Sequence, residues 1–99
     1  MNKYAEYVCK TLDDRELLEA LAEEAAELSQ AALKLIRANK LSNNFTPKSD
    51  VEAVKDLKEE LMDTLSVVYL LSHLVPTENE VDNYHKWERW AKRLGYVEI

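Results

Sequence analysis

The sequence predicts an all-α protein, an antiparallel helical bundle of three long helices and one short N-terminal helix. The chain has 99 residues with one glycine and two prolines, so it has few of the residues that tight turns between β-strands require. Alanine, leucine, glutamate and lysine dominate its long segments, and these residues lose little entropy in a helix. A chain of this length is expected to form a single domain over residues 1–99.

A short helix and a long helix are expected first. Residues 4–10 fit a short helix with apolar positions Tyr4, Tyr7 and Val8. Asp13 and Glu16 have the spacing of a capping box, which predicts a long helix from about residue 14 to residue 38. One face of that helix gathers apolar side chains at helical spacing, which predicts a buried stripe of Leu17, Leu21, Ala25, Leu28, Ala32 and Leu35.

Two further helix starts follow from the same capping chemistry. Ser49 with Glu52 predicts a second long helix over about residues 50–74. Thr77 with Glu80 predicts a third over about residues 78–94, with Gly95 as its C-cap. The second long helix is expected to bury the stripe Val54, Leu57, Leu61, Leu65 and Val68.

The segment Asn39–Ser49 is the one sizeable loop that the sequence predicts. Its composition is polar, with Ser42, Asn43, Asn44, Thr46 and Pro47. Loops of this length are often functional, so the segment is a candidate flap or substrate-contacting element.

Composition excludes several classes of function. A net charge of −6 without a basic arm argues against binding a nucleic-acid duplex. The apolar runs are shorter than the roughly 18 to 20 residues of a membrane span and no leader is evident, so a soluble, cytoplasmic protein is expected. Cys9 is the single cysteine, which excludes an intramolecular disulfide and a cysteine zinc site.

Because so short a chain is 46% hydrophobic, a homodimer or homotetramer is expected to complete the core.

Two acidic pairs are the strongest candidates for a functional site. Glu24 and Glu27 lie three residues apart on the first long helix, and Glu60 and Asp63 on the second. Such spacing lets both carboxylates of a pair converge on one side of a helix. Either pair alone could be a solvated helix face. Together they border the apolar faces of two periodic helices, where an unpaired carboxylate is costly unless it is neutralised or binds a cation.

The chemistry of the four acids favours a hard divalent ion. Oxygen ligands suit Mg²⁺, with Mn²⁺ as a substitute, better than zinc or copper. A di-iron bundle would need a histidine three residues after a glutamate, and neither Glu27 nor Glu60 is followed by one. Periodicity places Glu24 and Glu60 towards the helix interface and Glu27 and Asp63 at its rim, whereas solvent is expected around Glu23 and Glu59.

The segments Glu24-Ala-Ala-Glu27 and Glu60-Leu-Met-Asp63 resemble the Glu-x-x-Glu and Glu-x-x-Asp signature of MazG-like nucleotide pyrophosphohydrolases. This resemblance extends over most of the chain, although the stretch between the motifs is longer than in compact members. It implies magnesium-dependent hydrolysis of a (deoxy)nucleoside triphosphate to a monophosphate and pyrophosphate. It also implies that all four acids are metal ligands and catalytic residues, and leaves open which carboxylate activates water.

The last predicted helix is basic and aromatic. Lys86, Arg89 and Arg93 form a cationic stripe that could hold substrate phosphates, or could instead balance acids of the same helix and its C-terminal dipole. Trp87 and Trp90 are expected to pack in a core or a subunit interface. The apolar stripe of this helix is Tyr84, Trp87, Ala91 and Leu94.

Covalent catalysis has no support in the sequence. His73 is expected to be a hydrogen-bonded residue at a helix end, and the role of His85 stays open; neither lies beside a serine or cysteine as a nucleophile–base pair would. Two alternatives to the pyrophosphohydrolase remain. One is a non-catalytic helical interaction or regulatory module of the same fold, and the other is a phosphoribosyl-ATP pyrophosphohydrolase. The base recognised and the choice of dimer or tetramer are not specified by the sequence.

Overall fold

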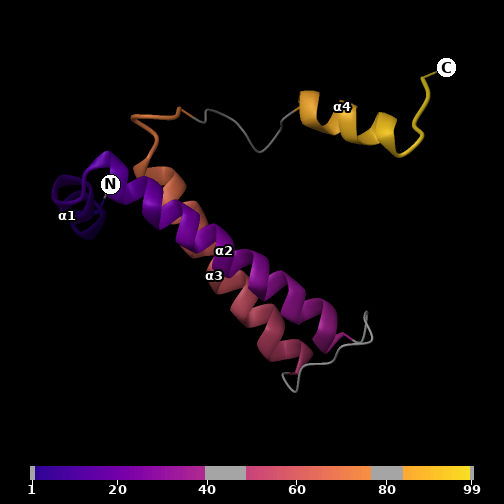
Figure 1. Cartoon of the computed structure of the whole chain (residues 1–99), viewed down its shortest axis with the longest axis horizontal. Helices are drawn as coiled ribbons and strands as arrows, with labels where there is room; N and C mark the ends of the chain where they lie inside the picture. Colours follow the sequence, from indigo (N-terminus) through magenta and orange to yellow (C-terminus); the bar gives the residue numbers. More distant parts are fainter. Residues whose placement is uncertain (1, 40–48, 77–83, 99) are drawn as a thin grey trace.

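Four helices form the described structure, a computed structural model that covers residues 2–39, 49–76 and 84–98. They are α1 (Lys3–Thr11), α2 (Asp14–Ala38), α3 (Asp50–Leu70) and α4 (Tyr84–Arg93). Helices α2 and α3 lie side by side as an antiparallel hairpin, α1 lies at one end of the hairpin, and α4 lies apart from it (Figure 1). The prediction of an all-helical chain is confirmed for the described ranges.

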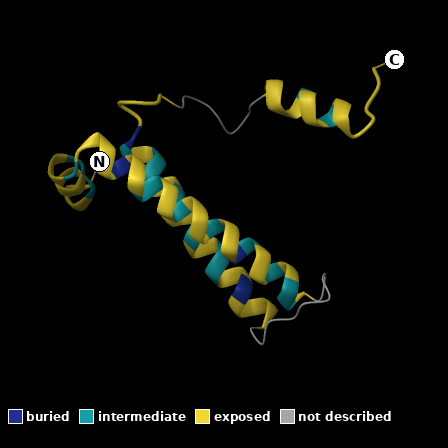
Figure 2. Ribbon diagram, in the orientation of Figure 1, coloured by how far each residue is buried: buried dark blue, intermediate teal, exposed yellow. Residues whose placement is uncertain are grey.

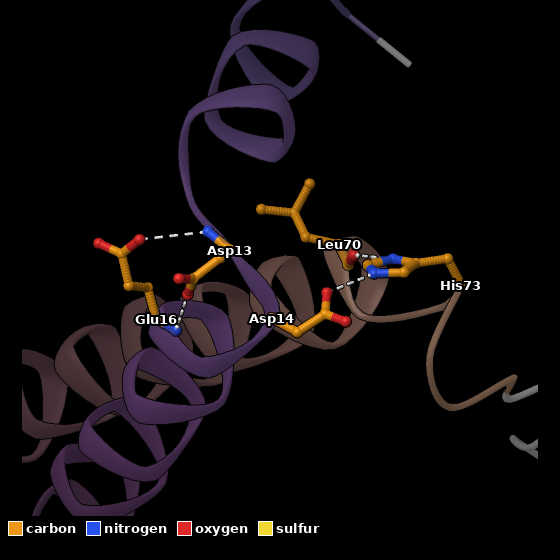
Figure 3. Close-up of polar contacts among 5 residues, drawn as sticks. All are labelled: Asp13, Asp14, Glu16, Leu70 and His73. Carbon is orange, nitrogen blue, oxygen red and sulfur yellow. Dashed lines mark hydrogen bonds and ion pairs between the residues drawn. The ribbon is translucent and has the colours of Figure 1, made fainter.

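Side-chain caps fix the starts of the first three helices. Asp13 and Glu16 form the expected capping box, in which the Glu16 amide donates to Asp13 Oδ1 at 2.8 Å and the Asp13 amide donates to Glu16 Oε1 at 3.2 Å (Figure 3). Ser49 Oγ accepts from the Glu52 amide at 3.3 Å and begins α3. Asn2 caps α1 by accepting from two amides at 2.9 Å each. The starts predicted at residues 13 and 49 are confirmed.

Helix α3 ends at Leu70 and not at the predicted residue 74. Its last turn tightens, because the Ser72 amide donates to the Tyr69 carbonyl at 3.2 Å and the Leu71 amide is shared between two carbonyls at 3.1 Å each. Pro76 follows closely and disfavours helical geometry in the residue before it. The four residues from 71 to 74 form turns, so this part of the prediction is wrong.

Helix α4 is described from Tyr84 onwards, and the predicted start at Thr77 and Glu80 lies outside the described residues. The C-terminal part of that prediction is confirmed. Gly95 has φ +101°, its amide donates to the Lys92 carbonyl at 3.1 Å, and the Tyr96 amide donates to the Ala91 carbonyl at 3.0 Å. These two bonds are those of a Schellman motif, which requires a left-handed residue that glycine supplies without strain.

The core of the described chain is thin and lies between α2 and α3 (Figure 2). The buried hydrophobic residues are Leu17 and Ala31 of α2, Ala53 of α3, and Leu71 just after α3. Among the described residues, Leu17 and Leu71 are large side chains that are almost fully enclosed, with 2% and 3% of their surface exposed. On α2 the predicted stripe is largely turned inward, although Ala25 is exposed.

Most of the predicted stripe of α3 does not face α2. Val54, Leu61 and Leu65 keep between 46% and 53% of their surface exposed, whereas Leu57 and Val68 are half-buried. The inward face consists of smaller or polar residues together with a few aliphatic ones: Ala53, Leu57, Glu60, Thr64, Val67 and Leu71. Small side chains allow close approach of two helices, so the hairpin packs through this face and leaves the larger aliphatic residues at its side.

Polar contacts join the two helices at both ends of the hairpin. At one end, His73 Nε2 donates to Asp14 Oδ1 at 2.7 Å (Figure 3). At the other end the side-chain amide of Asn39 lies against the Asp50 carboxylate. With the amide nitrogen assigned to that side, it donates to the two carboxylate oxygens at 2.9 and 2.6 Å. These contacts fix the relative position of α2 and α3 along their axes. In the described ranges, no helix has the length and apolarity needed to cross a membrane.

Candidate metal centre

Three of the four predicted acids meet between α2 and α3. Glu24, Glu60 and Asp63 each offer a carboxylate oxygen, and these oxygens lie within 4.8 Å of one another. Glu24 and Glu60 are half-buried in the helix interface, and Asp63 is exposed at its rim. Their degrees of burial follow the order that helical periodicity predicts. The hairpin therefore brings acids that are about forty residues apart in sequence into one cluster.

Thr64 fixes the helix register beside this cluster. Its hydroxyl donates to the Glu60 carbonyl at 2.8 Å within α3, and it also lies 3.4 Å from the Glu24 carbonyl on α2. The side chain is half-buried and short, so it fits between the two backbones. Both cluster glutamates are thereby held through their own main chains.

The acid cluster contains oxygens without a partner. Among the described residues, Glu24 Oε2 and Glu60 Oε2 are shielded from solvent and accept no hydrogen bond. Burying a carboxylate oxygen in this state is unfavourable unless the group is protonated or meets a cation. The arrangement thus has two oxygens that face inward and can accept an external positive charge.

The surroundings raise the pKa of both buried glutamates. For Glu24 the causes are partial burial, then the negative charges of Glu27, Asp63 and Glu23, offset in part by a hydrogen bond with Glu60. The pKa of Glu60 is raised by partial burial, then by a hydrogen bond with Glu27 and its charge, and then by the charges of Glu24 and Asp63. Like charges held close together disfavour ionisation, so Glu24 and Glu60 retain their protons to a higher pH than free carboxyls do.

Glu27 lies outside the three-acid group but borders it. It lines a hollow of about 140 Å³ that Glu60 also lines. The other lining residues are Gln30, Ala31, Lys34, Asp56 and Glu59. Because Glu60 belongs to both the hollow and the cluster, the two adjoin, and Glu27 lies beside the site.

Sequence reasoning missed three polar residues of this hollow, namely Gln30, Lys34 and Asp56. Their signal was present, because Gln30 and Lys34 follow Glu27 at three and seven residues and so share its side of α2. Lys34 brings a cation into an otherwise acidic hollow. Glu59, expected to be a solvated neighbour, is exposed and also lines the hollow.

The predicted phosphate-binding cations are not brought to the acids within the described chain. Lys86, Arg89 and Arg93 are exposed on α4, which lies apart from the hairpin (Figure 1). Lys86 Nζ lies 5.2 Å from the centroid of the Trp90 ring, within the range of a cation–π contact. The segment 40–48 of the predicted flap lies outside the described residues.

The histidines and the cysteine add no nucleophile to the site. His73 Nδ1 lies 3.1 Å from the Leu70 carbonyl while Nε2 contacts Asp14, so it is a hydrogen-bonded helix-end residue as predicted. His85 pairs edge-on with the ring of Tyr84, at 6.0 Å between centroids. Cys9 is a free thiol on α1, half-buried.

The donor set fits a hard divalent cation. All three candidate donor atoms are carboxylate oxygens carried by two helices, and Mg²⁺ binds through a few carboxylates while keeping waters that phosphates can replace. The two inward oxygens without partners are the positions such an ion would satisfy. No protein-family model, curated protein or solved structure matches this sequence. Function is therefore inferred from the residues of the site and their geometry.

Proposed function

We propose that this chain is a magnesium-dependent nucleoside triphosphate pyrophosphohydrolase, which hydrolyses a (deoxy)nucleoside triphosphate to the monophosphate and pyrophosphate. The observation that carries the proposal is the convergence of Glu24, Glu60 and Asp63 with two inward oxygens lacking partners. The resemblance of the two acidic motifs to MazG-like enzymes supports it. Apolar side chains such as leucine would pack the two helices together at less cost than half-buried carboxylates, so packing alone does not explain the cluster.

In this proposal Glu24, Glu60 and Asp63 hold Mg²⁺, or Mn²⁺ in its place, and Glu27 completes the site from the neighbouring hollow. When bound, the ion would neutralise phosphate charge and lower the pKa of a water. The half-buried position of Glu24 and Glu60 limits their access to solvent on the helix-interface side. The hydroxyl of Thr64 holds the backbones that carry them. A carboxylate oxygen of Glu24, Glu27, Glu60 or Asp63 that the ion leaves free would accept the proton of the attacking water.

Substrate phosphates would be held by Lys86, Arg89 and Arg93 in an oligomer. The hairpin is acidic around its cluster, and a triphosphate needs cations in addition to the metal ion. A homodimer or homotetramer in the cytoplasm is part of the proposal. Its basis is the exposed aliphatic face of α3, formed by Val54, Leu61 and Leu65, because contiguous apolar side chains on a surface often mark an interaction site.

Release of pyrophosphate tests the proposal. Common and modified nucleoside triphosphates and phosphoribosyl-ATP are each incubated with the protein, with and without Mg²⁺. We expect magnesium-dependent release from at least one nucleoside triphosphate, and its loss in Glu60→Gln. Glu23→Gln is the matched control, because Glu23 is exposed and adjacent to Glu24 but outside the cluster. Pyrophosphate release by Glu60→Gln at the wild-type rate would show that Glu60 takes no part in the reaction.

The same panel separates the alternatives. Turnover of phosphoribosyl-ATP alone would identify the protein as a phosphoribosyl-ATP pyrophosphohydrolase. Silence across the panel, in a protein that still binds Mg²⁺, identifies a helical module without catalysis.

A further inference from the structure

A histidine bridges the two helices at the end of the hairpin where α2 begins and α3 ends. His73 follows the last residue of α3 by three positions, and Asp14 is the first residue of α2. The ring Nε2 lies 2.7 Å from Asp14 Oδ1, and the ring Nδ1 lies 3.1 Å from the Leu70 carbonyl oxygen (Figure 3). Both nitrogens of one ring are therefore engaged, one with each helix.

Both atoms that this ring faces are hydrogen-bond acceptors. A backbone carbonyl has no proton to donate, and neither has an ionised carboxylate. A neutral imidazole carries one N–H group, whereas imidazolium carries two. Only the doubly protonated ring of His73 satisfies both contacts. A neutral ring would place a nitrogen lone pair against an oxygen lone pair at one of them.

Asp14 is the acid that faces the ring from α2. Its neighbour Asp13 is turned to the Glu16 amide instead, because these two residues form the capping box of α2 (Figure 3). Arg15 forms its ion pair within α2, with a residue four positions on. The contact between ring and carboxylate is thus specific to one acid of this helix start.

The other helices that meet here bring no second charge to the ring. The last turn of α3, residues 67–70, contains no charged residue, and Lys10 in the last turn of α1 is exposed. The pKa of His73 is raised chiefly by the hydrogen bond to Asp14, with the charge of Asp14 and the Leu70 carbonyl also raising it and partial burial opposing them. The groups that favour the second proton are those that the geometry places against the ring.

We propose that His73 acts as a pH-dependent latch, a contact that links the end of α3 to the start of α2 only while both ring nitrogens carry protons. When the ring loses one proton, the remaining N–H stays on Nε2, because a carboxylate is a stronger acceptor than a carbonyl. The Leu70 carbonyl then loses its side-chain donor. The turn at residues 71–75, which carries His73, is released from the end of α3.

This release is local. The Leu71 side chain stays enclosed in the core, with 3% of its surface exposed. His73 and Asp14 are half exposed, so solvent weakens their attraction and its loss does not unfold the hairpin. Because the residues after α3 lead to α4, the latch determines how firmly that segment is held where it leaves the hairpin. It does not depend on the proposed catalysis, and its test needs no substrate.

Nuclear magnetic resonance of the isotope-labelled protein tests the latch, over a range from about pH 5 to about pH 9 that spans the titration of a histidine. The His73 ring should lose its second proton with a midpoint above the ordinary pKa of 6.5, and the proton that remains should be on Nε2. The backbone amide resonances of residues 71–75 should shift with the same midpoint. A midpoint at or below 6.5, or turn resonances that do not follow the ring, would overturn the proposal.

Three variants separate the latch from a general effect of charge. Asp14→Asn should lower the midpoint of His73 towards its ordinary value and move the transition of residues 71–75 with it, because the amide keeps an acceptor oxygen but loses the charge. Asp13→Asn is the matched control, since it removes the same charge one residue away and asparagine still caps a helix; its midpoint should stay near that of the wild type. His73→Gln should abolish the transition of the turn.

Two results with these variants would contradict the proposal. Equal lowering of the midpoint by Asp13→Asn and Asp14→Asn would show that the acidity of the helix start, and not the direct contact, retains the second proton. A transition of residues 71–75 that persists in His73→Gln would show that another group releases the turn.

Discussion

Glu60→Gln should change the stability of the protein in opposite directions with and without magnesium. Without the ion, the substitution removes one of three carboxylates whose oxygens lie within 4.8 Å, so it should stabilise the fold. The effect should depend on pH. The pKa of Glu60 is raised above its ordinary value of 4.5 by partial burial and by neighbouring acids. The raised pKa of Glu60 therefore adds to the stability of the folded state fully below about pH 4.5, and this addition is lost as the pH rises through the raised pKa.

With magnesium the order of stability should reverse. An ion that binds only the folded state at a hundred times its Kd adds about 2.7 kcal/mol. For a domain of this size, that corresponds to a rise in Tm of about 10 to 20 °C. Wild-type protein should show most of this rise. Glu60→Gln should show little, because it loses one of the two inward oxygens that lack a partner.

The assay is thermal unfolding followed by circular dichroism, at several magnesium concentrations and at pH 5 and pH 8. Glu23→Gln serves as the control that removes one charge outside the cluster. If Glu60→Gln gains as much from magnesium as the wild type does, the cluster does not hold the ion. If Glu60→Gln destabilises the magnesium-free protein at pH 8, the repulsion inferred among the carboxylates is wrong.

Three further predictions concern the frame that positions the site. Leu17→Ala should lower the free energy of unfolding in urea by about 2 to 5 kcal/mol, because Leu17 is enclosed in the core, whereas Leu18→Ala on the exposed side of the same helix should cost less than about 1 kcal/mol. The pKa of His73 is raised mainly by its hydrogen bond to Asp14, so wild-type stability should fall as the pH rises above about 6.5 and through that raised pKa. Asp14→Asn should flatten this pH dependence. An unchanged slope of stability against pH would show that the hydrogen bond to Asp14 is not its cause. Asp13→Ala should remove the cap of α2 and cost about 0.5 to 2 kcal/mol in the same urea measurement, without loss of the other helices.

The sequence was sufficient for features that depend on neighbouring residues. Capping at Asp13 and Ser49 involves contacts three residues apart, and both starts were predicted correctly. Gly95 ends α4 for an equally local reason, its positive φ. The spacing of Glu60 and Asp63 likewise follows from one helix alone.

Only the tertiary structure decided which face of each helix is shared. Periodicity identified Val54, Leu57, Leu61, Leu65 and Val68 of α3 as core. Packing instead turned Ala53 and Thr64 inward and left Val54, Leu61 and Leu65 exposed. The rotation of one helix against another depends on how closely both backbones can approach, which a single amphipathic pattern does not contain.

The same packing decided the membership of the site. Lys34 lines the hollow beside Glu27 because α2 and α3 meet there. Lys86, in contrast, lies on a helix apart from the acids. The local chemistry of the chain therefore determined its helices and its acidic pairs. The rotation and pairing of α2 and α3 determined that Glu24, Glu60 and Asp63 form one cluster, since their convergence is a long-range contact between two rigid helices.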